Sequence, residues 1–203
     1  MAKKNIEETI INAAAKIFLE KGMDGARMQE IAKAAGINQA GLHYYFRSKE
    51  RLFNTVMKKR VRAFFRSFAE TLPQADDFET FLKSFIENYL DHINKHVLFM
   101  RFVIWEVQRG APIMSEAMKE AVDGGDLPLN MFLEKIKIAQ EAGIVRVVDP
   151  TQFMITTVSA CIFPFIARPV LENVFQFSVT GNEFLRMRKE EIYRVLWNGI
   201  KKQ

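Results

Sequence analysis

The side chains best suited to specific hydrogen bonding lie in residues 27–49. Gln39 and His43 are four residues apart, so both lie on one face of a helix. The Gln39 amide can form two hydrogen bonds with an adenine edge, and the neighbouring Ala40 can contact a thymine methyl group. Lys49, at the start of the next predicted helix, is placed where a phosphate would bind favourably. These types and spacings indicate contact with nucleic acid rather than covalent catalysis.

Two short helices are needed to position these side chains. The apolar-periodic segment 28–35 ends at Gly36, which can adopt the left-handed conformation of a turn. Ile37 is expected to enter the core, and Asn38 is expected to cap the second helix. Gly41 costs that helix about 1 kcal/mol relative to alanine, and close approach to the floor of a DNA groove would explain this cost. The pattern is typical of a helix-turn-helix.

Other candidate sites have weaker support. His92 and His96 have the spacing of a metal-binding pair, but Asn94-Lys95 is expected to break the helix between them, and no metal is predicted. Cys161 lies in an apolar segment and is expected to be a buried, inert thiol. Neither a glycine-rich phosphate loop nor a Ser-His-Asp set can be assembled from the sequence. No catalytic residue and no cofactor are therefore predicted, and the protein is not expected to be an enzyme.

Composition and charge limit the class of protein. Of 203 residues, 49% are hydrophobic and 26% charged, which excludes global disorder. Residues 1–72 hold 14 Lys and Arg against 7 Asp and Glu, a net charge of +7, whereas residues 73–203 hold 15 against 17, a net charge of −2. A basic first third indicates an anionic partner, although a solvated basic face is the alternative. The single cysteine, the lack of a secretory signal and the lack of an apolar run of roughly 20 residues predict a cytoplasmic protein without a membrane partner.

Helical periodicity runs through nearly the whole chain. The first helix is expected to end at Gly22, and a long helix is expected from Ser48 to about Leu72, before Pro73. Asp76 is the expected cap of the next helix. Further helices are predicted over about 96–109, 113–122, 128–143, 149–167 and 182–202. The predicted fold is all-α, with about nine or ten helices.

The helix-turn-helix also resembles a known family. Residues 30–32 (EIA), 35–37 (AGI), 41–46 (GLHYYF) and 48–52 (SKERL) closely resemble the DNA-binding domain of TetR-type (TetR/AcrR) transcriptional regulators. The resemblance covers residues 6–53 without a gap. It implies a DNA-binding domain over residues 1–47 and a ligand-binding and dimerisation domain over residues 48–203. It also implies a homodimeric repressor that binds double-stranded, palindromic operator DNA and is released by a small, hydrophobic effector.

The candidate DNA-binding residues belong to the motif and its flanks. They are Arg27, Gln29, Asn38, Gln39, Ala40, Gly41, His43, Tyr44, Tyr45 and Lys49. Two of them depart from the family pattern, which usually has a hydroxyl residue near position 27 and often a tyrosine at position 43. Arg27 therefore leaves its helix without the usual cap, or contacts phosphate instead, and Tyr44 or Tyr45 is expected to replace the contact at position 43.

The remaining candidates are apolar for the most part. The chain has 18 Phe and 10 Met, more than packing alone requires, and such side chains form adaptable cavities. The candidate ligand-binding residues are Phe65, Phe68, Phe85, Tyr89, Arg101, Phe102, Trp105, Phe132 and Phe163. The resemblance implies that the last two long helices pair with their two-fold mates. The candidate interface residues there are Ile155, Phe163, Tyr193, Leu196 and Trp197.

Two other classes of function stay open from the residues alone. The first is a helical, non-enzymatic binder of an apolar ligand whose basic face is incidental. The second is an enzyme, for which no residue can be nominated. Binding to DNA that weakens steeply with salt would distinguish a regulator from both.

Overall fold

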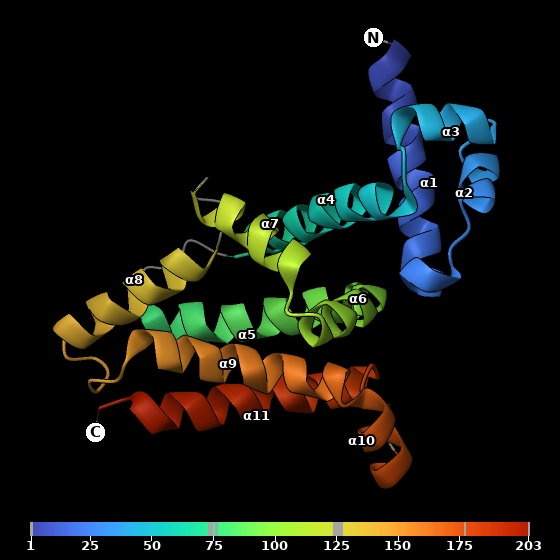
Figure 1. The fold of residues 1–203 in the computed structure, drawn as a ribbon. Helices are drawn as coiled ribbons and strands as arrows, with labels where there is room; N and C mark the ends of the chain where they lie inside the picture. Colours follow the sequence, from blue (N-terminus) through green and yellow to red (C-terminus); the bar gives the residue numbers. More distant parts are fainter. Residues whose placement is uncertain (1, 73–74, 76, 124–127, 177, 203) are drawn as a thin grey trace. The chain divides into compact units, whose positions relative to one another are not determined.

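The computed structural model describes residues 2–72, 75, 77–123, 128–176 and 178–202. Every regular element in these residues is a helix (Figure 1), as the sequence predicted. The chain forms two compact units. The first unit comprises residues 1–64 and 101–124, and the second comprises residues 65–100 and 125–203. Two helices, α4 (Lys49–Ala69) and α6 (Val97–Gln108), contribute to both units.

The first unit contains the helix-turn-helix. Its other helices, besides parts of α4 and α6, are α1 (Ala2–Gly25), α2 (Met28–Ala34), α3 (Gln39–Tyr45) and α7 (Pro112–Asp123). Helix α2 packs against both α1 and α3. The predicted stop at Gly22 is a kink within α1, where the glycine has φ 70° and ψ 179°. The fully buried side chains around these helices are mostly aliphatic, and they include Ile10, Ala14, Ile31, Leu42, Leu52 and Val56.

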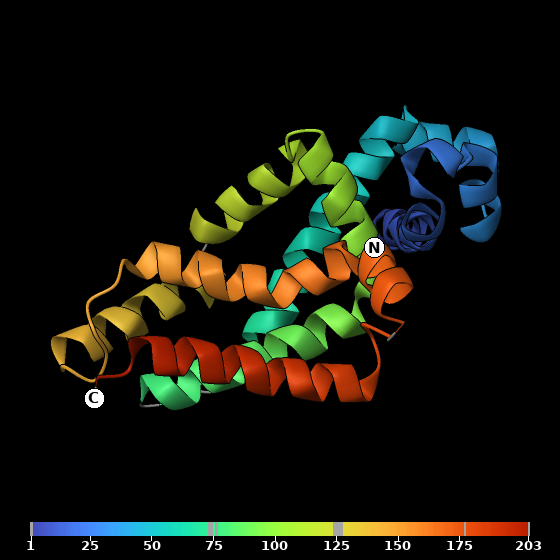
Figure 2. The same ribbon diagram turned by 90° about the horizontal axis from the view of Figure 1, so that it is seen from below.

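The second unit is a helical bundle with a phenylalanine core. It contains α5 (Phe78–Lys95), α8 (Pro128–Glu141), α9 (Pro150–Ile166), α10 (Arg168–Phe175) and α11 (Asn182–Ile200). Helix α5 packs against α8, α9 and α11, and Figures 1 and 2 show α5, α9 and α11 running alongside one another. Neighbouring rings in the core have centroids 5.0–6.4 Å apart. The rings belong to Phe78, Phe81, Phe85, Phe132 and Phe153.

Helix α10 was not predicted. The chain turns by 66° after α9 and starts a new helix at Arg168. Pro169 in its first turn and the Arg168–Glu172 ion pair, with Nε and Oε2 3.0 Å apart, are its local signals. Among the described residues, no single helix is both long and apolar enough to span a membrane, and α9 with α10 meets that criterion only as a bent pair.

The predicted end of α4 and the predicted start of α5 differ from those in the structure. Helix α4 ends at Ala69 rather than near Leu72, because the chain closes into a turn in which the Thr71 hydroxyl donates to the Phe68 carbonyl. The expected cap Asp76 lies outside the described residues, as does Pro73. Asp77 caps α5, and its carboxylate accepts a 2.8 Å hydrogen bond from the Thr80 N–H, which lowers the pKa of Asp77.

Candidate nucleic-acid interface and ligand sites

The turn between α2 and α3 has the predicted geometry. Gly36 has φ 69°, in the left-handed region. The Asn38 side chain caps α3, since its Oδ1 accepts a 2.7 Å hydrogen bond from the Gly41 N–H. Ile37 is half-buried, so it covers the core rather than lying fully within it. These contacts fix the start of α3 relative to α2.

A contact within the protein also explains why position 41 is a glycine. A Cβ at this position would lie 3.1 Å from Asn38 Oδ1, closer than most such contacts in proteins. The absence of a side chain therefore gives the capping carboxamide room to reach the helix N-terminus.

The predicted DNA contacts lie on the surface of the first unit. Gln39 and Ala40, at the start of α3, are exposed, and so is His43 one turn later. Tyr44 is 70% exposed, with its ring perpendicular to that of the half-buried Tyr45 and the centroids 5.4 Å apart. Arg27, Gln29 and Asn38 are exposed, and Gly41 and Lys49 are half-buried. The candidates on α3 are thus mostly accessible on one short helix. Their contact with DNA stays a prediction.

The start of α4 is anchored beside α3. Ser48 Oγ accepts a 3.1 Å hydrogen bond from the Arg51 N–H, as a capping residue does. Lys49 Nζ donates to the Ala26 carbonyl at 3.3 Å, so this ammonium joins α4 to the α1–α2 loop and retains two further protons for a phosphate. Arg27 occupies the N-cap position of α2 without capping it. Arg47, exposed directly after α3, was not among the predicted contacts, although its charge and position were a usable signal.

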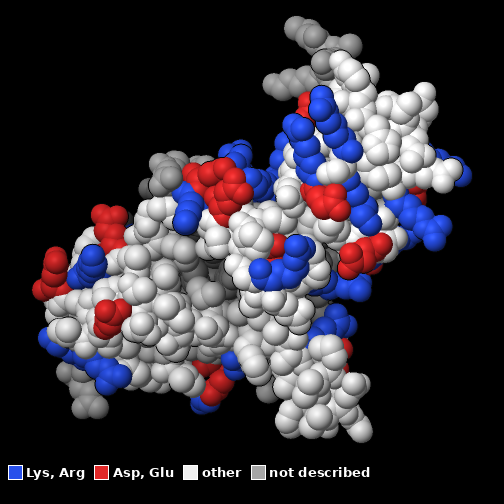
Figure 3. All heavy atoms as spheres, viewed as in Figure 1, with Lys and Arg blue, Asp and Glu red and all other residues white. Residues whose placement is uncertain are grey.

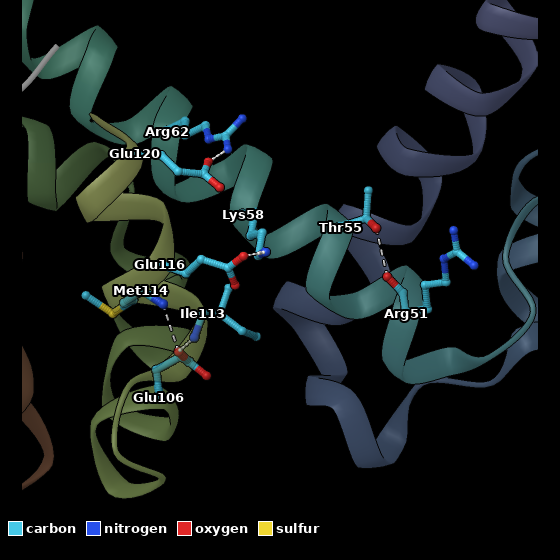
Figure 4. A network of polar contacts seen from close by, with 9 residues as sticks. All are labelled: Arg51, Thr55, Lys58, Arg62, Glu106, Ile113, Met114, Glu116 and Glu120. Carbon is cyan, nitrogen blue, oxygen red and sulfur yellow. Dashed lines mark hydrogen bonds and ion pairs between the residues drawn. The ribbon is translucent and has the colours of Figure 1, made fainter. Parts of the chain in front are cut away.

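Positive charge gathers over the N-terminal helices, as Figure 3 shows. Farther along α4, two cations are paired with α7: Lys58 with Glu116, and Arg62 with Glu120 (Figure 4). These pairs are largely exposed, and each such pair contributes at most about 1 kcal/mol. They offset the charges of Lys58 and Arg62, whereas Lys49 and Arg51 lie at the start of α4, next to α3.

A buried carboxylate positions α7 in the same unit. Glu106 is fully buried, and its Oε2 accepts hydrogen bonds from the Ile113 N–H at 2.8 Å and the Met114 N–H at 3.0 Å (Figure 4). A negative charge at a helix N-terminus is favourable. Glu106 on α6 therefore caps the N-terminus of α7.

The predicted ligand-binding residues fall into two groups. Arg101, Phe102 and Trp105 belong to the first unit, where they line a hollow with α1 and α4. The other six belong to the second unit. Of these, Phe68, Phe85, Tyr89 and Phe132 are buried against one another, Phe65 is half-buried and Phe163 is 58% exposed. The role of these nine residues in ligand binding stays a prediction.

The predicted interface residues differ in accessibility. Ile155 and Phe163 on α9 are 47% and 58% exposed, which suits a contact surface. Leu196 and Trp197 on α11 are half-buried. Tyr193 is used within its own chain, because its hydroxyl donates to Glu79 Oε1 on α5 at 2.5 Å. Burial and this hydrogen bond raise the pKa of Tyr193 to about 12.

Three side chains of the second unit belong to residue types that bind metals or act as nucleophiles: His92, His96 and Cys161. Helix α5 ends at Lys95 and His96 is its C-cap, so the helix ends between the two histidines as expected, and their ring centroids are 4.6 Å apart. In the described part of the chain, however, no three histidine, cysteine or acidic residues are grouped to hold a metal ion. Cys161 is buried as expected, and burial raises the pKa of its thiol to about 12.

Comparison with known proteins assigns the family. A sequence profile described as "Bacterial regulatory proteins, tetR family" matches residues 10–56, and one described as "Tetracyclin repressor-like, C-terminal domain" matches residues 79–196. The chain belongs to the TetR family. It is therefore a transcriptional regulator with a helix-turn-helix DNA-binding domain, and not an enzyme. The first profile covers the α2–α3 motif, and the second begins within α5 and ends within α11.

Individual TetR-family relatives agree with this assignment over the full length. The regulator RutR of Escherichia coli K12 is 26% identical over 206 aligned positions, which cover 96% of this chain and 90% of RutR. Among solved structures, a transcriptional regulator from Saccharomonospora viridis in complex with choline has a TM-score of 0.74 at 17% identity, covering 98% of this chain and 100% of that one. AibR, in complex with isovaleryl coenzyme A and operator DNA, has a TM-score of 0.66 at 16% identity, covering 94% and 97%. These structural likenesses establish the fold.

Proposed function

We propose that this TetR-family regulator is a homodimeric repressor that binds palindromic operator DNA through α3 and is released by a small, hydrophobic effector. The observation that carries the proposal is the surface of α3, where Gln39, Ala40 and His43 are accessible at the end of a capped, well-anchored helix. Such a helix fits the major groove, with its N-terminal residues at the base edges. The proposed domains are residues 1–47 for DNA binding and 48–203 for effector binding and dimerisation.

The size of one DNA-binding domain supports a dimer. A single α3 offers too little surface for tight, specific binding, so two must act on one operator. Exposed apolar side chains occur on both helices proposed to pair: Ile155 and Phe163 on α9, and Met187 and Val195 on α11. Apolar side chains gathered on one face are typical of an interface. Two-fold pairing requires inverted half-sites with centres roughly 34–36 Å apart.

Helix α4 supports the proposed response to an effector. It runs without interruption from Lys49, beside α3, to Phe65 and Phe68 in the second unit. Its 21 residues span about 31 Å, so a displacement at one end is transmitted to the other. An effector bound against Phe65 or Phe68 would release DNA only to the extent that it prefers the geometry that does not bind DNA.

A paired titration tests the proposal. Candidate hydrophobic compounds are titrated into the free protein and into its complex with the palindrome that flanks its own gene. Linkage requires the operator to weaken effector binding by the same factor by which the effector weakens operator binding. Equal effector affinities in the two titrations would exclude that compound as the inducer. A reporter gene behind the same palindrome tests repression, because an activator would raise its expression.

A further inference from the structure

The first unit contains a hollow beside the kink of α1, which we call the kink pocket. Its volume is about 200 Å³. Its walls are residues 18, 19 and 21–23 of α1, Phe53 and Met57 of α4, and the face of α6 that carries Arg101 and Trp105. The floor is apolar and buried, with Phe18 and Phe53 each about 2% exposed and Met57 fully buried.

The kink explains why this space exists and why an arginine lies at its edge. Gly22, which lines the pocket, has φ 70° and ψ 179°, so α1 is interrupted at this residue. The carbonyls of the preceding turn lose their helical partners there. One of them, that of Glu20, accepts a 3.4 Å hydrogen bond from Arg101 Nη1. This contact is long and lies near the surface, so a better acceptor can replace it.

The walls of the kink pocket favour an aromatic guest. The Phe53 ring meets the rings of Phe18 and Trp105 edge to face, at centroid distances of 4.9 and 5.0 Å and interplanar angles of 86° and 74°. A further ring can adopt the same arrangement with them. An apolar cavity of about 150 Å³ is known to hold one benzene ring. A pocket of about 200 Å³ therefore has room for one ring and one small substituent.

The charges around the kink pocket favour an anionic substituent. Arg101 and Lys21 are the charged residues that line it, and Arg109 stacks on Trp105 with its guanidinium carbon 4.3 Å from the ring centroid. Lys21 also pairs with Glu30, with both side chains well exposed. Glu30 thus offsets part of the Lys21 charge, whereas Arg101 donates to a neutral carbonyl. An arginine presents two parallel N–H groups to a carboxylate, which is a strong and specific contact.

We propose that the kink pocket binds a small aromatic carboxylate, with the ring against Phe53 and Trp105 and the carboxylate on Arg101. The ligand takes the place of the Glu20 carbonyl as the acceptor for Arg101. The site lies wholly within the first unit and is separate from the effector site proposed around Phe65 and Phe68. It does not depend on dimerisation or on operator binding.

Trp105 reports directly on this site. The chain has two tryptophans, so Trp197→Phe leaves Trp105 as the single emitter. Benzoate is titrated into this variant without DNA, and benzamide, a neutral compound of nearly the same shape, is titrated in parallel. We expect benzoate to change the Trp105 emission saturably and to bind at least about tenfold more tightly than benzamide, because the contact with Arg101 is charge-assisted.

Two variants in the same background complete the test. Arg101→Gln should remove the preference for benzoate over benzamide. Arg146→Gln, at an exposed arginine of the second unit, should keep it. The proposal fails if benzoate causes no saturable change, if benzamide binds equally well, or if Arg101→Gln leaves the preference intact. The comparison of the two compounds needs no variant of Arg101, so it stands even if Arg101→Gln is unstable.

Discussion

The helix-turn-helix of the first unit and the α9–α11 face of the second unit expose opposite kinds of side chain. Around α3 the interior is mostly aliphatic, with Ile31 and Leu42 fully buried, and the surface carries amide, imidazole and phenol groups. In the second unit phenylalanine fills the interior, and apolar side chains such as Phe163 and Val195 also lie outside. The first surface suits a hydrated, charged partner and the second suits an apolar one. The contrast places the proposed DNA contact and the proposed contact between subunits on different surfaces.

The largest effect is expected from a charge in the apolar face. Phe163→Glu should give monomers, because a carboxylate cannot be buried in that interface without a partner. Operator affinity should then fall on the order of a thousandfold, towards the level of non-specific binding. Sedimentation velocity and gel shifts measure both effects. The matched control is Val147→Glu, at a residue 88% exposed outside α9 and α11, which should stay dimeric. A stable dimer of Phe163→Glu would place the interface elsewhere.

The next effect concerns the polar surface of α3. Gln39→Ala should cost about 1–3 kcal/mol at one base position of each half-site, because two hydrogen bonds to one base are lost. Binding to a panel of operator variants measures this change in specificity. Gln108→Ala, at an exposed glutamine at the end of α6, should bind every variant as the wild type does. If Gln39→Ala also binds all of them normally, α3 does not read the bases at this position.

A third prediction concerns Glu106, the buried carboxylate of the first unit. Glu106→Ala should lower the free energy of unfolding by about 2 kcal/mol, because the Ile113 and Met114 N–H groups lose a charged acceptor. Urea denaturation measures it. Glu106→Gln keeps an acceptor oxygen and should lose less. Glu116→Ala, which removes one partner of an exposed pair, should lose less than about 1 kcal/mol. Equal stability of the two alanine variants would contradict the assigned role of Glu106.

The smallest effect is expected at the cap of α3. Asn38→Ala should destabilise the protein by about 1 kcal/mol, since the Gly41 N–H loses its acceptor. Asn38→Ser restores a capping oxygen and should recover most of that loss. Thermal unfolding followed by circular dichroism compares the three proteins. A Ser variant no more stable than the Ala variant would show that the cap does not contribute through this hydrogen bond.

Local features of the first unit could be predicted from sequence because they depend on single residues. Gly36, Asn38 and Ser48 each direct a turn or a cap by their own conformational or hydrogen-bonding preference, and the structure has all three in those roles. Once the ends of α3 are set by these residues, the helical spacing also predicts that Gln39 and His43 lie on one face, and both are exposed. The capping role of Glu106 could not be predicted, since it depends on a turn in which Ala111 adopts φ 54°. Alanine rarely adopts that conformation.

Features of the second unit depend on contacts that sequence periodicity does not specify. An apolar stripe predicts that Phe85 and Phe132 are buried, but not whether they face each other or a ligand, and the structure packs the two rings together at 5.0 Å. The hydrogen bond from the Tyr193 hydroxyl to Glu79 on α5 likewise depends on how α11 packs, and the place of Tyr193 at the subunit interface stays a prediction. Helix α10 was missed because the preceding apolar segment hides the 66° bend at its start.

Equilibrium binding to DNA across a range of salt concentrations tests the central claim most directly. The full-length protein is titrated against a duplex containing the palindrome that flanks its own gene, and against a duplex with that palindrome scrambled. We predict that the logarithm of the binding constant falls linearly with the logarithm of salt concentration for both duplexes. We also predict that the palindrome binds tighter by about a thousandfold or more at physiological salt. Equal affinity for the two duplexes, or binding that does not change with salt, would contradict the assignment of α3 as the surface that reads operator DNA.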